Sequence, residues 1–426
     1  MQKTLEQKLA NIHANPSSAK DFILADAKDA DMAFGIGAPG LSPERHDGEL
    51  KYKTLAEYRA QIREILQQGL VDIMLMSAST SEVLALQEKL FENSPVTPAA
   101  RANDTTDVHV LRGGKYITQD ALPFSSATLD HIQCGHLNCA PAERLRGVNL
   151  GLYSLTFNND ATDDRARLEE YKRFRLEAEA KGFRHFLEVF DPHPADRVPA
   201  DKVAGFVNDA IARTLAGVTG KGRPVFLKIV YHGPKAMEEL VAYDPHLVVG
   251  ILGGSAGTTY DAFKMLAEAK KYGARAALYG RKINSAECQL AFVRLLRHIA
   301  DGDLTAEDAV KAYHGVLQKL KIQPKRTLEE DMQLQTNVMS YAGNGTVISL
   351  PTSPRSMTGG SRATAVSSQP SAVSKTETKK NCKCGGGCCA SKKGYPTLAS
   401  GEPDFARMTT AQKVAYHAEQ RKKIWG

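Results

Sequence analysis

The sequence has 426 residues, of which 42% are hydrophobic and 24% charged, and its 55 Lys and Arg residues against 48 Asp and Glu residues give a net charge of +7. This length exceeds the roughly 250–300 residues at which a single hydrophobic core stops growing, so we expect one large domain with further segments. From residue 333 onward there are thirteen basic and four acidic residues, which leaves 42 basic and 44 acidic residues in 1–332. A broad basic face on the main body is therefore excluded, and we expect no nucleic-acid partner.

Targeting signals are not evident in the sequence. No apolar run approaches the roughly 18 residues of a transmembrane helix, and the polar opening MQKTLEQKLANIHANPSS lacks the apolar core of a signal peptide. The three Cys residues before residue 333 are too few for a disulfide scaffold, which fits a reducing compartment. We therefore expect a cytoplasmic protein without a transmembrane segment.

Short apolar runs alternate with longer helical patterns from residue 22 to about residue 300. The runs predict eight strands, at 22–28, 71–76, 107–112, 149–157, 184–190, 224–230, 247–252 and 274–280. The clearest helical patterns lie at 54–69, 166–182 and 259–273, and two more follow the last strand at 285–301 and 305–321. Eight βα units in about 280 residues predict a (β/α)₈ TIM barrel over residues 1–332, with a doubly wound open sheet as the alternative.

The C-terminal segment has a different composition. Residues 333–408 are rich in Ser, Thr, Gly and Pro, which predicts a disordered linker, and they contain the Cys cluster CKCGGGCC at 382–389. That cluster fits either soft-metal binding or free thiols. Residues 409–426 predict a basic amphipathic helix that packs on the barrel, on an anionic membrane or on a partner. A linker with a terminal helix resembles the tails that deliver enzymes into bacterial microcompartments, which implies docking to a microcompartment shell.

Two charged residues interrupt apolar strands at the ends where barrel enzymes carry their chemistry. Lys228 lies in PVFLKIV, and burial there favours its neutral, nucleophilic amine. Glu188 occupies the equivalent place in FLEVF of the preceding strand, within reach of Lys228 if the strands are neighbours. The pair suits imine chemistry, in which the lysine attacks a carbonyl and the acid transfers protons. A purely structural ion pair has the same geometry and stays open.

Three further groups complete the candidate site. Asp26, in the first strand, is a third acid–base candidate if Leu24 points into the barrel, with Lys28 next on the same face. Two loops then favour phosphate binding, because glycine lets backbone N–H groups approach an anion and arginine adds paired donors. The residues are Gly253, Gly254 and Ser255 after the seventh strand, and Gly280 and Arg281 after the eighth. His232 is a candidate substrate contact on the face of Lys228.

The motifs FLEVFDP, VFLKIV, GILGGSAG and ALYGRKIN resemble the class I aldolases of the tagatose-bisphosphate and archaeal fructose-bisphosphate type, over roughly residues 20–300. The resemblance implies that Lys228 forms the Schiff base, that Glu188 assists proton transfer and that Asp26 is the acid of the first strand. It also implies that the glycine loops hold the phosphate of a sugar substrate. We expect an aldehyde-lyase of carbohydrate metabolism that needs no cofactor and forms a homo-oligomer.

Two other functions compete with this interpretation. The spacing of His131, Cys134, His136 and Cys139 would allow a tetrahedral zinc ion, and a metal-dependent lyase would use it as a Lewis acid. The same residues also fit a plain loop with free thiols. A non-catalytic barrel, recruited through its C-terminal helix, is the second alternative.

Overall fold

The computed structural model describes residues 1–42, 52–109, 111–254 and 257–335, and short pieces at 395–397, 403–404, 407–409, 411–412 and 415–416. The chain divides into two compact units. The first comprises Met1–Ser42 and Asp47–Pro351, and the second comprises Pro43–His46 and Thr352–Gly426. In the described residues, no helix combines the length and the apolar character that crossing a membrane requires.

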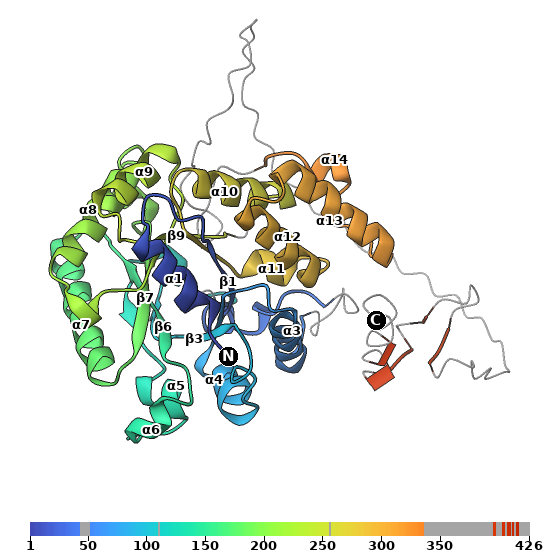
Figure 1. The fold of residues 1–426 in the computed structure, drawn as a ribbon, viewed down its shortest axis with the longest axis horizontal. Coiled ribbons are helices and arrows are strands. Elements are labelled where there is room, and N and C mark those ends of the chain that lie inside the picture. The colour runs from blue at the N-terminus through green and yellow to red at the C-terminus, as the bar shows by residue number, and fades with distance from the viewer. Residues whose placement is uncertain are drawn as a thin grey trace, which may run out of the picture. The chain divides into compact units, whose positions relative to one another are not determined.

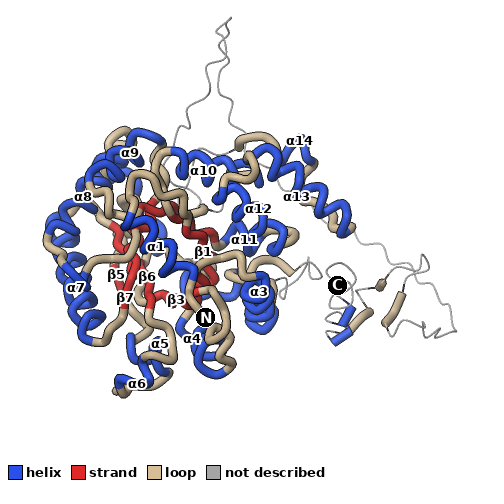
Figure 2. The backbone as a smooth tube through the Cα atoms, in the orientation of Figure 1, coloured by secondary structure: helices blue, strands red, loops and turns tan. Residues whose placement is uncertain are grey.

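A closed barrel of eight parallel strands forms the centre of the first unit, and helices surround it (Figure 1, Figure 2). The strands follow one another around the barrel in chain order, and the last pairs with the first. The predicted (β/α)₈ barrel is thus confirmed. Its strands are β1 (Ile23–Lys28), β2 (Ile73–Met76), β3 (Thr97–Arg101), β6 (Leu150–Thr156), β7 (Arg184–Phe190), β8 (Leu227–Ile229), β9 (Val249–Leu252) and β10 (Ala276–Tyr279).

Long helices follow most strands, as the periodicity predicts. They are α1 (Thr4–Ala14), α3 (Leu55–Gln68), α7 (Ala161–Ala180), α8 (Val203–Ala216), α9 (Pro234–Tyr243), α10 (Thr259–Lys271), α12 (Gln289–Asp301) and α13 (Ala306–Leu320). Shorter helices are α2 (Asp31–Phe34), α4 (Ala78–Ser81), α5 (Leu129–Cys134), α6 (Pro141–Arg144), α11 (Arg281–Ser285) and α14 (Leu328–Asp331). Single turns are η1 (Gly35–Gly37), η2 (Glu82–Gln87), η3 (Tyr116–Thr118), η4 (Ala195–Arg197) and η5 (Gly220–Gly222).

Local sequence signals set several of these helix ends. Helix α3 begins at a capping box between Thr54 and Glu57 and ends at Gly69, which adopts the left-handed conformation. Helix α13 begins after Thr305, whose hydroxyl accepts the backbone N–H of Asp308. These signals are local, so the sequence alone places the helix ends to within a residue or two.

The third barrel strand differs from the prediction. It is β3, ten residues earlier than the predicted run at 107–112, where the described residues form a turn. Strand β3 has the sequence TPAAR, which lacks the large β-branched residues of the other strands. Next to it, β4 (Asp104–Thr105) and β5 (Pro123–Phe124) form a small antiparallel pair. The pairing of β3 between β2 and β6 therefore depends on tertiary contacts that its composition does not reveal.

Both faces of the barrel strands are apolar. One core cluster joins the apolar side of α1 to alternating strand residues that include Ile23, Ala25 and Ala27 of β1, which identifies it as the barrel interior. The other cluster joins the surrounding helices to the intervening residues, such as Leu24. Figure 1 shows α1 in front of the strands, where its apolar side closes the N-terminal end of the barrel.

Strand β9 contributes Gly250 to the barrel wall, in register with Lys228 of β8. A Cβ on Gly250 would lie 2.6 Å from the carbonyl oxygen of Leu227 and 2.8 Å from the Cβ of Ala276. Both distances are shorter than van der Waals contact, so only glycine fits there without a shift of the backbone. The close approach of β8, β9 and β10 depends on this residue.

The C-terminal predictions fall mostly outside the described residues, including the Cys cluster at 382–389 and most of the linker and terminal helix. In the second unit, Thr397 and Pro403 form a bridge, and the ring centroids of Tyr395 and Tyr416 lie 5.2 Å apart. The backbone N–H of Gln412 donates to Thr409 Oγ1 at 3.3 Å, and the amide oxygen of Gln412 accepts from Thr409 N at 2.9 Å. These two contacts form a capping box.

Barrel contacts continue past residue 332. The carbonyl of Gln333 accepts from Thr258 Oγ1 at 2.8 Å, and the backbone N–H of Gln335 donates to Asp261 at 3.2 Å. The boundary at residue 332 stays a prediction.

Replacing Gly250 with Ala should lower the free energy of unfolding by about 1–3 kcal/mol, because the added methyl overpacks the barrel wall. Urea unfolding followed by circular dichroism measures the change. Gly205→Ala in α8 is the matched control, since its new Cβ meets nothing within 4 Å and alanine stabilises a helix interior by up to about 1 kcal/mol. Equal stability of the two variants would contradict the packing argument.

Candidate active site

Lys228 and Glu188 form a buried ion pair at the C-terminal ends of β8 and β7. The two residues stand directly opposite each other in the strand register. Lys228 Nζ lies 2.5 Å from Glu188 Oε1, and the side chains are 4% and 0% exposed. At this distance the two groups form a close acid–base pair. The sequence placed both residues on neighbouring strands, and the structure brings them together.

Arg101, at the end of β3, is a second buried cation in the same layer. Its Nε donates to Asp29 Oδ2 at 2.6 Å and its Nη1 donates to Asp104 Oδ1 at 2.9 Å. Its Nη2 lies 3.7 Å from Glu188 Oε2, which also accepts from the hydroxyl of Ser154 at 2.8 Å. The two oxygens of Glu188 are thus divided between Lys228 on one side and Arg101 with Ser154 on the other.

Sequence reasoning missed Arg101, Asp29 and Asp104. Arg101 follows a short run of small residues that does not read as a strand, so no strand end was expected there. Asp29 continues the inward alternation of Ala25 and Ala27, and this parity is the signal that could have identified it.

The structure does not bring Asp26 to Lys228. Asp26 shares the outward parity of Leu24, which packs against the surrounding helices. Its Oδ2 lies 3.4 Å from Lys28 Nζ, and Lys28 donates to Asn284 Oδ1 at 2.5 Å and Gln289 Oε1 at 2.9 Å. The expected inward parity of Asp26 and Lys28 was wrong. A leucine at position 24 is equally compatible with the barrel interior and with the helix-facing side, so its hydrophobicity does not tell the two faces apart.

Asp26 and Lys28 form a separate polar network between β1 and the helices. Both are fully buried, and burial raises the pKa of the Asp26 carboxyl to about 6 although Lys28 opposes this shift. Burial also lowers the pKa of the Lys28 ammonium. Each partner compensates part of the desolvation of the other, so the network joins α11 and α12 to the first strand.

The predicted phosphate loops line one cavity together with Lys228 and Asp29. Gly254 has φ +58°, a conformation that favours glycine, and a Cβ on Gly280 would lie 2.6 Å from the carbonyl oxygen of Ala27. The Arg281 guanidinium lies 5.1 Å from the centroid of the Phe34 ring. The remaining residues of the wall are Ala27, Ala30, Leu252, Gly253 and Leu278. Ser255 lies outside the described residues.

His232 follows β8, and its side chain is 6% exposed. Its Nε2 lies 2.7 Å from Asp191 Oδ1, beyond the end of β7. The structure therefore places His232 at the same end of the barrel as Lys228, next to a carboxylate that the sequence did not single out.

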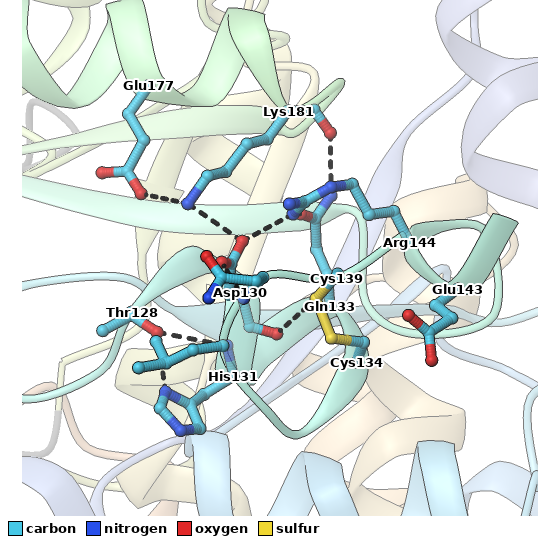
Figure 3. Close-up of polar contacts among 12 residues, drawn as sticks. Thr128, Asp130, His131, Gln133, Cys134, Cys139, Glu143, Arg144, Glu177 and Lys181 are labelled. Carbon is cyan, nitrogen blue, oxygen red and sulfur yellow. Dashed lines mark hydrogen bonds and ion pairs between the residues drawn. A yellow bond between two sulfur atoms is a disulfide. The ribbon is translucent and has the colours of Figure 1, made fainter. Parts of the chain in front are cut away.

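The proposed zinc ligands do not converge. Cys134 and Cys139 form a disulfide, which leaves no thiolate for a metal (Figure 3). His131 Nδ1 lies 2.7 Å from Thr128 Oγ1, whereas His136 Nε2 lies 3.2 Å from Glu143. Across the described part of the chain, no group of three or more His, Cys, Asp and Glu residues is arranged to hold a metal ion.

Figure 3 also shows what holds this loop in place. Asp130 Oδ1 lies 2.7 Å from Arg144 Nη1 and 2.9 Å from Lys181 Nζ, so one carboxylate joins α5 to the last residue of α6 and to the residue after α7. The disulfide contradicts the expectation of free thiols at Cys134 and Cys139. It also disagrees with the reducing compartment inferred from the Cys count, because disulfides are rare in reducing compartments. The location in the cytoplasm stays a prediction.

Comparisons with known proteins give limited information. No family model matches the chain, and no curated protein matches it either. An archaeal fructose 1,6-bisphosphate aldolase is 16% identical, with 70% of this chain and 100% of that chain covered and a TM-score of 0.48. An archaeal aldolase with its catalytic Lys bound to a carbinolamine intermediate is 18% identical, with the same coverage and TM-score.

The deoxyribose phosphate aldolase of Aeropyrum pernix is 14% identical, with 69% of this chain and 95% of that chain covered and a TM-score of 0.33. At these scores and identities, the likenesses carry no argument about this chain. The barrel is established by its own strand pairing.

The pKa of Asp104 makes a stability prediction. Burial raises this pKa to about 6; Arg101 opposes the shift, and the Asp29 and Glu188 carboxylates add to it. An unfolded Asp titrates near pH 4, so between about pH 4 and 6 the folded protein keeps a proton that the unfolded chain has lost. The stabilisation is complete below about pH 4 and disappears as the pH rises through about 6.

Asp104→Asn should therefore reduce the fall in unfolding free energy between pH 4 and pH 7 by about 2–3 kcal/mol. Urea unfolding of both proteins at the two pH values measures the difference. An unchanged pH dependence in the variant would show that Asp104 does not hold this proton.

Proposed function

We propose that this protein is a Schiff-base (class I) aldolase that cleaves or forms a C–C bond in a phosphorylated ketose. The observation that carries the proposal is the buried contact of 2.5 Å between Lys228 Nζ and Glu188 Oε1, at a cavity that Gly253, Gly254, Gly280 and Arg281 also line. A buried amine next to a proton acceptor is the arrangement that imine formation requires. The loops at Gly253–Gly254 and Gly280–Arg281 suit a phosphate group.

The reaction follows from these positions. Lys228 Nζ, after passing a proton to Glu188, attacks the C2 carbonyl of the ketose and forms a carbinolamine. Glu188 returns the proton to the C2 hydroxyl, which leaves as water and gives an iminium ion. A base then removes the proton of the C4 hydroxyl, the C3–C4 bond breaks, and its electron pair forms an enamine while the aldehyde departs. Protonation of the enamine at C3 and hydrolysis of the imine release the second fragment and regenerate Lys228.

Asp29 is the candidate base for the C4 hydroxyl. It lines the cavity with Lys228, and Arg101 fixes one of its oxygens at 2.6 Å. Arg101 also balances part of the negative charge of Asp29, Asp104 and Glu188. In this assignment Asp29 takes the role that the resemblance gave to Asp26.

The phosphate at C1 would lie against Gly253, Gly254, Gly280 and Arg281. Backbone N–H groups at the glycines can approach the anion closely, and the guanidinium offers paired donors. The first fragment would then be dihydroxyacetone phosphate or a close relative. The metal-dependent alternative loses two of its four proposed ligands, Cys134 and Cys139, to the disulfide.

Borohydride trapping tests the proposal. Incubation of the protein with dihydroxyacetone phosphate and borohydride should give a reduced adduct on Lys228, seen by mass spectrometry of peptides. Lys228→Met should abolish both the adduct and turnover, and Glu188→Gln should lower turnover by about 10²–10⁴-fold through loss of proton transfer. The matched control is Lys235→Met, an exposed lysine at the start of α9, which should behave as wild type.

Full turnover by Lys228→Met would end the imine mechanism. The absence of both adduct and turnover in the wild-type protein, with a panel of sugar phosphates, would favour the non-catalytic barrel.

The C-terminal segment is proposed to deliver the enzyme to a protein partner such as a microcompartment shell, and the barrel to form a homo-oligomer. Deletion of residues 352–426 should leave kcat and KM unchanged, because the Lys228 cavity consists of residues of the first unit. Steady-state kinetics and cosedimentation with shell proteins compare the two chains. A large loss of kcat in the shortened protein would show that the segment takes part in catalysis.

A further inference from the structure

The proposed reaction leaves a second group of polar side chains at the same end of the barrel unexplained. They follow the strands on the side away from the phosphate loops: Thr156 ends β6, Asp191 and His193 follow β7, and His232 follows β8. Asp107, after β4, joins them, because its Oδ2 accepts from Thr156 Oγ1 at 3.1 Å. We call these five residues the distal group.

Within the distal group, Thr156 lies one layer further toward the barrel mouth than the catalytic pair. Thr156 is two residues beyond Ser154, which contacts Glu188. Two residues of a strand span about 7 Å, and they point to the same face of the sheet. This is about the reach of a three- or four-carbon chain that extends from an imine at Lys228.

Three buried polar atoms of the distal group have no hydrogen-bond partner within the described residues: the carboxylate oxygens Asp107 Oδ1 and Asp191 Oδ2, and the imidazole nitrogen His193 Nε2. The other Asp191 oxygen is 2.7 Å from His232 Nε2. Buried polar atoms without a partner are costly, so such atoms point to a ligand group that pairs with them. A hydroxyl fits both kinds of group, because it donates to a carboxylate and either donates to or accepts from an imidazole.

The charges of this side disfavour a second phosphate. Asp107 and Asp191 are carboxylates, and a phosphate placed between them would meet like charges with little water to screen them. Two arginines at this end of the barrel are paired with other carboxylates: Arg101 contacts Asp29, Asp104 and Glu188, and Arg197 pairs with Asp120. The phosphate loops and the distal group therefore differ in charge on the two sides of Lys228.

We infer that the distal group binds the hydroxyl groups of a non-phosphorylated aldehyde, so that the substrate is a ketose with its phosphate at C1 alone. This inference rests on the proposed function and adds the substrate class to it. The phosphate loops hold one end of the chain, the imine forms at C2, and the uncharged hydroxyls of the other end contact Asp191, His193 and His232.

The test is aldol condensation of dihydroxyacetone phosphate with either D-glyceraldehyde or D-glyceraldehyde 3-phosphate. The wild-type enzyme should prefer the uncharged aldehyde in kcat/KM by about tenfold or more, because like charges across a binding site are strongly unfavourable. Asp191→Asn should raise KM for glyceraldehyde and shift the preference toward the phosphorylated aldehyde. Borohydride trapping of dihydroxyacetone phosphate should remain at the wild-type level in this variant, which shows that it is folded.

The matched control is Asp196→Asn, an exposed carboxylate five residues further along the same loop, which should leave the preference unchanged. An equal or reversed preference in a wild-type protein that still forms the Lys228 adduct would overturn this inference and leave the proposed function intact. A preference that Asp191→Asn does not alter would overturn the assignment of the distal group. The absence of any adduct would refute the proposed function and this inference together.

Discussion

The buried contact between Lys228 and Glu188 is the constraint on which the rest of the site depends. Removing two charges from water is costly, and their attraction compensates this only if further polar groups satisfy them. Here Ser154 and Arg101 hold the second oxygen of Glu188, and Arg101 is held in turn by Asp29 and Asp104. These neighbours are therefore constrained by the pair.

The parallel barrel explains why this pair was predictable from the sequence while other parts were not. The apolar runs around β7 and β8 contain one buried charged residue each, Glu188 and Lys228, and neighbouring parallel strands in register must bring those charges together. The glycine loops were equally predictable from the sequence, because they directly follow apolar strands. In β1, however, both faces are buried, so hydrophobicity could not tell Leu24 from Ala25, and Asp26 was assigned the inward parity that belongs to Asp29.

Tertiary contacts decided the remaining differences. Strand β3 is a run of small residues that pairs with its neighbours β2 and β6. Because the third strand was predicted at 107–112, Arg101 was not recognised as a residue at a strand end. The Cys134–Cys139 disulfide depends on the turn after α5, which brings the two sulfurs together, and spacing alone fits a metal site or free thiols equally well. The charge distribution, in contrast, follows from the sequence alone: the net charge of +7 divides into a nearly neutral barrel and a basic C-terminal segment.

Formation of an enamine at Lys228 is the central claim, and proton exchange tests it most directly. In D₂O, the enamine form of dihydroxyacetone phosphate takes up deuterium at the carbon that would form the new bond, and proton NMR follows the loss of that signal. The account predicts exchange with the wild-type protein and none with Lys228→Met. No exchange with the wild type, or equal exchange with both proteins, would contradict it.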